Sequence, residues 1–519
     1  MFPASVCPAN RMSLEGMWRF MIDPTDSGEK NQWFKSNFSM YIKLPGIMQP
    51  QFGMDISTST PWVLSLYDRF WYLRDDYKTY LEPGKVKVPF LSQPPRHYVG
   101  VAWYQRDIDL YQYQQARRFV LNLERPHWET TVWLDGQKIG SNRSLVAPHV
   151  YDLGTLSAGR HRLTIRVDNR MVMPYRPDAH SVSDSLGASW NGITGRIELV
   201  DTGRVWIDDV RAFPNLTEKK MLIKVRIGNQ TGLSGTGTLT AIWPDIGITH
   251  ATWDENGGTA EIEVPLRLEQ ENWDEFNPRL YPLRLWLRSP GVEEYYDLKV
   301  GLRELRAVGK EFVLNNRPII FRGTQNGGDF PLTGYPPTDV ASWKKMFETC
   351  KAWGLNHMRF HSWTPPEAAF VAADELGFYL QVEPGMWNEI SPGTPMEKML
   401  YEETDRIIKA YGNHPSFMLM SASNEPKGKW QESLSKWVER YRTEDPRRLY
   451  TTGTGHTERE IENLTKGTDY LAIHRIGTKM LRRESGWYGR DYKETLEDIN
   501  LPVIAHEVGQ WAAYPTMKS

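Results

Sequence analysis

The feature that most constrains the fold is a change of rhythm after Leu302. Beyond it, short apolar runs alternate with segments of helical period, which is typical of parallel strands joined by crossover helices. One such segment, 340–353, is followed by Gly354, as expected where a helix ends. The apolar runs predict seven strands, at 318–322, 356–361, 378–382, 417–420, 449–452, 470–473 and 502–505. Units of this kind predict a β/α barrel, whose closed form has eight strands.

The chain ends at Ser519, about a dozen residues past the last predicted strand. That stretch is too short for another helix, an eighth strand and its helix. We therefore expect residues 303–519 to form a barrel that is truncated before its last strand. Strands one and seven would then expose unpaired edges.

The first 302 residues have no comparable helical rhythm. Turn signals separate alternating apolar and polar runs at 101–110, 118–123, 130–134 and 161–167, which predicts a β-sandwich over 1–200. A second set of runs lies at 221–227, 237–242, 260–264 and 281–287. About 100 residues with such strands match an immunoglobulin-like sandwich, predicted here for 201–302.

Composition excludes several classes of function. The net charge is −2 and there is no long basic run, which disfavours a nucleic-acid partner. No apolar stretch is long enough to span a membrane. The first residues do not resemble a signal peptide, so we expect a cytoplasmic protein unless a leader has been removed. Two cysteines, Cys7 and Cys350, are too few for a disulfide framework or a Cys-rich zinc site. The sequence does not decide whether the protein forms a homo-oligomer.

Two glutamates stand at the ends of predicted barrel strands. Glu425 follows the run at 417–420, and Glu507 follows the run at 502–505. The carboxyl ends of barrel strands form the face that carries catalysis. Cleavage of a glycosidic bond needs two carboxyl groups, one to protonate the leaving oxygen and one to attack or to activate water. The alternative is that both glutamates lie in surface turns.

Short motifs along nearly the whole chain resemble glycoside hydrolase family 2, which contains β-galactosidases, β-glucuronidases and β-mannosidases. They include Ser-Asn-Glu-Pro at 423–426 and others at 103–106, 131–136, 190–199, 277–281, 300–304 and 314–323. Each motif is weak alone, but their order and spacing favour the family. The resemblance implies that the first sandwich is a jelly-roll of the galactose-binding type. It also implies that no cofactor is required.

The resemblance implies a retaining mechanism. Glu507 matches the family's nucleophile, and Glu425 matches its general acid/base, which must carry a proton near neutral pH. Asn424 matches the residue that holds the sugar's 2-hydroxyl group; the alternative is an ordinary turn asparagine. The acidic pattern that binds magnesium in some galactosidases is not recognisable at 382–389, so we expect no metal.

Further candidate substrate contacts follow from position. Arg359 and His361 share one face of the second predicted strand, because they are two residues apart. The alternative for this pair is a structural ion pair and a buried, hydrogen-bonded histidine. Other candidates at strand ends or in the following loops are His474, Trp511, Trp387 and Asp329. For both tryptophans, core packing is an equal alternative.

Two other functions fit parts of the sequence. His357 and His361 have the spacing of a helical zinc motif, but four residues of strand span about 13 Å, too far for one metal ion. The other rival is a non-catalytic carbohydrate-binding protein in which the incomplete barrel is only a scaffold. For an enzyme, a β-galactoside is the first choice of substrate from its frequency in the family, with β-glucuronides and β-mannosides as alternatives.

Overall fold

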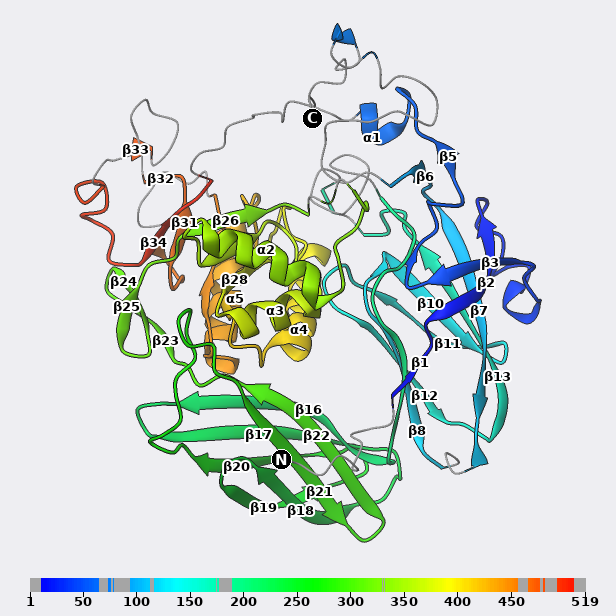
Figure 1. The fold of residues 1–519 in the computed structure, drawn as a ribbon, viewed down its shortest axis with the longest axis horizontal. Coiled ribbons are helices and arrows are strands. Elements are labelled where there is room, and N and C mark those ends of the chain that lie inside the picture. The colour runs from blue at the N-terminus through cyan, green and yellow to red at the C-terminus, as the bar shows by residue number, and fades with distance from the viewer. Residues whose placement is uncertain are drawn as a thin grey trace.

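The structure is a computed structural model of the 519-residue chain. It describes residues 11–64, 73–75, 78, 94–112, 116–173, 175–176, 189–328, 330, 332–455, 465–476, 479–480 and 492–507. Figure 1 shows two β-rich regions, at the right and the bottom of the view, and an α/β region at the upper left. Among the described residues, no helix is both long and apolar enough to cross a membrane.

The two largest sheets of the first β-rich region are antiparallel and face each other. They share a core to which both contribute, including Trp18, Phe20 and Tyr104 from one sheet and Leu121 and Ile197 from the other. The six-stranded sheet has the order β11 (Gln137–Arg143), β10 (Glu129–Leu134), β13 (Gly159–Asp168), β7 (Val101–Leu110), β2 (Gly16–Asp23) and β3 (Met40–Leu44). The four-stranded sheet has the order β1 (Arg11–Ser13), β15 (Ile197–Thr202), β8 (Arg118–Leu123) and β12 (His149–Thr155).

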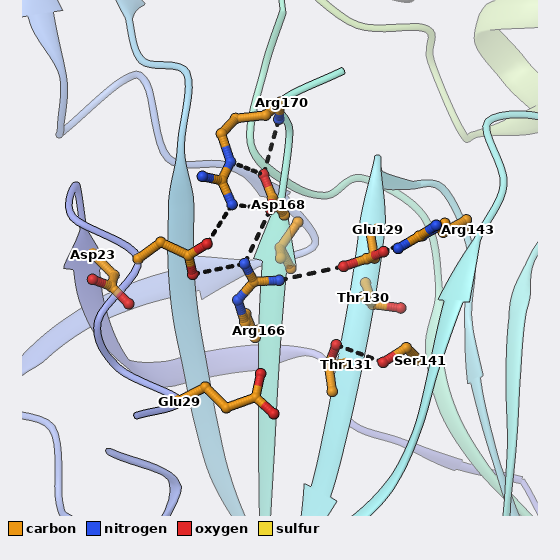
Figure 2. A network of polar contacts seen from close by, with 12 residues as sticks. Asp23, Glu29, Glu129, Thr130, Thr131, Ser141, Arg143, Arg166, Asp168 and Arg170 are labelled. Carbon is orange, nitrogen blue, oxygen red and sulfur yellow. Dashed lines mark hydrogen bonds and ion pairs between the residues drawn. The ribbon is translucent and has the colours of Figure 1, made fainter. Parts of the chain in front are cut away.

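The outer face of the six-stranded sheet carries a polar network (Figure 2). Arg166 donates to Asp168 at 3.0 Å and to Glu129 at 3.4 Å, and Arg170 donates to the same aspartate at 2.6 Å. Beside this network, aromatic rings pack into a small core of their own: Trp33, Phe34, Trp103 and Trp133. Because these charges are paired and these rings pack against one another, this set of aromatic residues stabilises the sheet.

The second β-rich region also has two sheets around one core. One sheet contains β16 (Val205–Asn215), β17 (Lys220–Asn229) and β20 (Gly258–Pro265). The other has the order β19 (Ile246–Trp253), β18 (Gly235–Ile242), β21 (Tyr281–Ser289) and β22 (Val292–Val300). Inward-facing residues alternate with outward-facing ones along these strands, as in β17, where Met221, Ile223 and Val225 are buried.

The α/β region is built on parallel strands. One sheet runs β26 (Gly323–Asn326), β27 (His357–Phe360), β28 (Tyr379–Val382), β29 (Phe417–Ser421) and β30 (Leu449–Thr451). Single bridges from Thr454 lead on to the parallel pair β31 (Leu471–Ile473) and β34 (Val503–Ala505). Four helices connect the first five strands: α2 (Val340–Ala352), α3 (Glu367–Leu376), α4 (Pro395–Tyr411) and α5 (Trp430–Glu444). This arrangement places the end of each strand at one common rim.

Shorter elements complete the described chain. They are η1 (Trp33–Lys35), β4 (Gly46–Ile47), β5 (Met54–Asp55), α1 (Pro61–Leu64), β6 (Arg96–His97), β9 (Pro126–His127), β14 (Gly192–Ile193), β23 (Leu305–Val308), β24 (Glu311–Leu314), β25 (Arg317–Ile319), β32 (Arg475–Ile476) and β33 (Lys479–Met480).

The first barrel strand lies later in the sequence than predicted. The sequence predicts this strand at 318–322, but Arg317–Ile319 pairs antiparallel with β24 in a small sheet, β23-β24-β25. The first parallel strand is β26, which begins at Gly323 and pairs with β27. The apolar run misled the prediction because Ile319 and Phe321 pack against a cluster that contains Tyr379, Leu419 and Ala472 of the parallel strands, although neither residue belongs to such a strand.

A groove lies between the first and the last of these parallel strands. It encloses about 720 Å³ and is lined by residues of both β26 and β34, together with Arg359 and His506. The predicted lack of an eighth strand is not tested, because residues 508–519 lie outside the described part of the chain.

The first sandwich is fixed to the rim of the barrel. Arg125, which is buried, donates to the carbonyl of Thr364 in the loop after β27. Ser144 donates to the buried carboxylate of Glu403 on α4 at 2.9 Å. Several sandwich side chains, among them Trp128 and Val146, belong to the same apolar cluster as the barrel helices. The sandwich therefore helps to hold the loop that follows β27.

We predict that His149 makes the protein sensitive to acid. Burial lowers its pKa to about 3, from an ordinary value near 6.5. As pH falls below 6.5, the unfolded chain takes up a proton that the folded chain refuses, so stability falls by about 1.4 kcal/mol per pH unit from this group. The loss continues down to about pH 3. Its neutral form is held between Thr130 at 2.6 Å and the carbonyl of Ser144 at 3.0 Å.

The check is calorimetric unfolding of the full chain between pH 7 and pH 5. His149→Gln keeps a donor toward the Ser144 carbonyl but cannot titrate. The stability of this variant should therefore fall less steeply with decreasing pH than that of the unmodified chain. The difference in slope should correspond to the uptake of about one proton on unfolding. Equal slopes for the two proteins would contradict the assignment.

Candidate active site

The two glutamates both stand where the backbone takes a rare conformation. Glu425 follows β29 with φ of 39°, and Glu507 follows β34 with φ of 50°. Ser362, just after β27, has φ of 58°. Left-handed φ angles are uncommon for residues other than glycine and concentrate where function requires a fixed side-chain direction. Neighbouring strands maintain the first of these turns, since the Glu425 N–H donates to the carbonyl of Thr454 at 2.8 Å.

The segments that carry these glutamates meet around Gly455. A β-carbon added to this glycine would lie 3.2 Å from Cγ of Glu425 and 2.8 Å from Cε1 of His506, the neighbour of Glu507. Gly455 itself has φ of 63°. The glycine therefore leaves the space in which the ends of β29 and β34 approach each other.

Arg359, on β27, is the hub of the site. Its guanidinium is buried and lies 3.9 Å from Oε1 of Glu507. An arginine has five N–H donors and no acceptor. Here those donors meet five side chains: Glu383 (2.7 and 3.2 Å), Asn424 (2.8 Å), Thr454 (2.5 Å), His506 (2.6 Å) and Gln325 (3.2 Å). Arg359 therefore forms a buried ion pair, which was the alternative to a substrate contact. A direct contact of Arg359 with a sugar remains a prediction.

Glu383 is a residue of the site that the sequence analysis missed. It follows β28, is fully buried, and forms a two-point ion pair with Arg359. It also accepts from the Ser362 N–H at 2.7 Å and from Gln381 at 3.3 Å. The rule that identified Glu425, a carboxylate shortly after a barrel strand, applies equally to Glu383, which directly follows β28.

We predict that Glu383→Leu lowers the free energy of unfolding by about 3–5 kcal/mol, because it leaves a buried guanidinium without its counter-charge. Glu383→Leu combined with Arg359→Met should recover most of this loss, since the double change removes both charges. Thermal unfolding measures both effects. Glu444→Gln is the control, because its pair with Arg440 is exposed and contributes less than about 1 kcal/mol. A double variant no more stable than Glu383→Leu would contradict the pairing.

His361 lies beside the proposed nucleophile. Its Nε2 is 3.5 Å from Oε1 of Glu507, and its Nδ1 is 3.3 Å from Oγ of Ser362. Its ring and the ring of Trp387 form a T-shaped contact at a centroid distance of 5.2 Å. The face of that tryptophan is covered by the guanidinium of Arg176, from the first sandwich, at 4.4 Å. His361 therefore lies beside both Glu507 and Trp387, and a contact of either residue with a substrate remains a prediction.

Asn424 is also directed into the site. Its side-chain oxygen accepts from Arg359 at 2.8 Å and from Thr454 at 3.2 Å. Arginine can only donate, so this contact fixes which end of the amide is oxygen. A contact between the N–H₂ end and a sugar hydroxyl group remains a prediction.

The remaining predicted site residues fall into two groups. His474 is buried at the end of β31, where its Nε2 accepts from Arg475 at 3.1 and 3.2 Å, and its ring lies 6.1 Å from that of His506. Trp511 and Asp329 lie outside the described residues.

The zinc-like pair does not share a site. His357 begins β27 and His361 follows it, so the two are separated by the length of a strand. Burial and the nearby Arg359 lower the pKa of His357 to about 3. In the described part of the chain, no group of three or more His, Cys, Asp or Glu side chains is placed to hold a metal ion.

Comparison with known proteins adds to this geometry. Residues 305–510 match the family described as glycosyl hydrolases family 2, TIM barrel domain. β-Glucuronidase of Rattus norvegicus is 24% identical over 432 residues, covering 72% of this chain and 66% of that enzyme. β-Galactosidase of Staphylococcus xylosus is 21% identical over 417 residues, covering 76% of this chain and 39% of that enzyme. The chain thus spans less than two thirds of the length of these relatives.

Solved structures show the same fold. β-Glucuronidase from Ruminococcus gnavus in complex with D-glucuronic acid superposes with a TM-score of 0.71 at 18% sequence identity. The match covers 97% of this chain and 84% of the other. The resemblance to this family and to its barrel domain, both predicted from the sequence, is confirmed. Residues 305–510 of the chain match the TIM barrel domain of glycosyl hydrolases family 2.

Proposed function

We propose that this chain contains the catalytic centre of a retaining exo-β-glycosidase, with Glu507 as nucleophile and Glu425 as general acid/base. The observation that carries the proposal is the meeting of the two strand ends at Gly455, beside the buried Arg359. The division into domains 1–200, 201–302 and 303–519 is proposed with it.

The proposed reaction has two displacements. In the first, an Oε atom of Glu507 forms a bond to the anomeric carbon while the bond to the leaving oxygen breaks, and Glu425 gives its proton to that oxygen. In the second, Glu425 takes a proton from water, the water oxygen bonds to the anomeric carbon, and Glu507 leaves as a carboxylate. The positive charge of Arg359, 3.9 Å from Oε1 of Glu507, favours the ionised nucleophile.

Two sugars are candidates for the substrate. Similarity to the rat and Ruminococcus gnavus β-glucuronidases supports a terminal β-glucuronide, and similarity to the Staphylococcus xylosus β-galactosidase supports a terminal β-galactoside. The comparisons therefore support a β-glucuronide at least as well as the β-galactoside predicted from the sequence. A panel of nitrophenyl β-glucuronide, β-galactoside and β-mannoside decides. Hydrolysis of the first or second fits the proposal, and preference for the mannoside contradicts both.

The same panel separates an enzyme from a sugar-binding protein. If the chain only binds carbohydrate, it should retain a glycoside without releasing nitrophenol. Proton NMR on an active chain then gives the stereochemistry, because a retaining enzyme first releases the β-anomer. First release of the α-anomer would rule out the double displacement.

A further inference from the structure

His506 makes a contact that fixes its protonation state. Nη1 of Arg359 lies 2.6 Å from Nε2 of His506. A guanidinium has donors only and does not lose its proton in proteins, so this nitrogen of the imidazole must be the acceptor. The ring is then neutral, with its proton on Nδ1.

This assignment changes the meaning of a second short distance. Nε2 of His506 also lies 3.4 Å from Oε1 of Glu507. With its lone pair directed at Arg359, Nε2 carries no proton to share with the carboxylate, so this approach is not an ion pair. The charge of Glu507 is met by Arg359 at 3.9 Å and by His361 at 3.5 Å.

The ring has little room to move. His506 is 3% exposed, and its backbone N–H donates to the carbonyl of Ile473 at 2.8 Å. Its Cε1 lies against Gly455. The charged and titratable groups that face it come from every neighbouring strand end: Arg359 with Glu383 behind it, Glu425, His474 and Glu507.

We infer that His506 is a positioning residue for the proposed hydrolysis, and that only its neutral form holds Arg359 in place beside Glu507. Glu383 accepts hydrogen bonds from Nε and Nη2 of the guanidinium, and His506 accepts one from Nη1. A proton on Nε2 would end the hydrogen bond and place two positive groups in contact. The inference rests on the proposed function and adds an acidic limit to it.

Two substitutions distinguish the effect of the hydrogen-bond acceptor on His506 from the effect of the volume of its side chain. His506→Gln can place an amide oxygen near the position of Nε2, whereas His506→Phe keeps an aromatic ring and removes the acceptor. We expect the Phe variant to lose about 10²-fold in kcat with little change in KM, because a displaced group costs about that much. The Gln variant should keep kcat within about tenfold and lose the acidic decline that His506 gives the pH profile. Unchanged kcat in the Phe variant, or an equal loss in both variants, would overturn the inference.

A second measurement does not depend on turnover. Nitrogen NMR of the imidazole groups, with His506 assigned by its absence in His506→Gln, should show a neutral ring with its proton on Nδ1 at pH 7. A doubly protonated ring, or a proton on Nε2, would overturn the inference. An unmodified chain that gives the expected NMR signal but hydrolyses no glycoside would instead count against the proposed function. If the Phe variant does not fold, the Gln variant and the NMR signal decide.

Discussion

Glu507→Gln should reduce kcat/KM on the best aryl β-glycoside by at least about 10⁴-fold, because loss of the group that forms the covalent bond removes the whole reaction path. The amide has the size of the carboxylate but is a far weaker nucleophile. It also lacks the charge that Arg359 and His361 face at 3.9 and 3.5 Å. Steady-state kinetics of the purified full chain measures the effect.

A smaller substitution at the same position allows chemical rescue. In Glu507→Gly, azide can enter the vacated space and attack the anomeric carbon from the nucleophile's side. The product should be the α-glycosyl azide, with inverted configuration. Glu389→Gln is the matched control, since Glu389 is an exposed carboxylate in a nearby loop. A loss as large in the control as in Glu507→Gln, or rescue that gives the β-azide, would show that Glu507 is not the nucleophile.

Glu425→Gln should have an effect that depends on the leaving group. A general acid contributes about 10²–10⁴-fold when the departing oxygen needs a proton. Alkyl β-glycosides should therefore lose kcat/KM by that factor, while dinitrophenyl glycosides, whose leaving groups depart as stable anions, should lose far less. The second displacement still lacks its base, so a burst of dinitrophenol should precede a slow steady state.

The contrast between leaving groups is the diagnostic result for Glu425. In Glu425→Gly, azide should attack the glycosyl-enzyme from the acid/base side and give the β-glycosyl azide. If alkyl and dinitrophenyl glycosides are impaired by the same factor, Glu425 does not protonate the leaving oxygen.

Strand periodicity was readable from the sequence where strands alternate or end at a clear signal. The predicted runs at 101–110 and 118–123 coincide with β7 and β8, and the helix at 340–353 with α2. The first barrel strand was misplaced because its residues, Gly323–Asn326, are mostly polar, whereas the preceding apolar run packs against residues of the parallel strands. Apolar character alone does not distinguish a barrel strand from a segment that packs against one.

The two proposed catalytic glutamates could be found because each lies within about four residues of the end of an apolar strand. Glu383 and His506 also follow strands, yet their importance lies in contacts with Arg359, from residues 24 and 147 positions away in the chain. Such pairing depends on the curvature of the sheet, which a single sequence does not specify. For the same reason the sequence left Arg359 open between a sugar contact and an ion pair.

The most direct test of the central claim is to trap the covalent intermediate and find the residue that carries it. A 2-deoxy-2-fluoro β-glycosyl fluoride of the preferred sugar slows both displacements but keeps a good leaving group, so the glycosyl-enzyme should accumulate. Mass spectrometry of the digested protein should then show one fluorosugar on the peptide that contains Glu507, and none in Glu507→Gln. A label on any other residue, or turnover without a covalent label, would contradict the account.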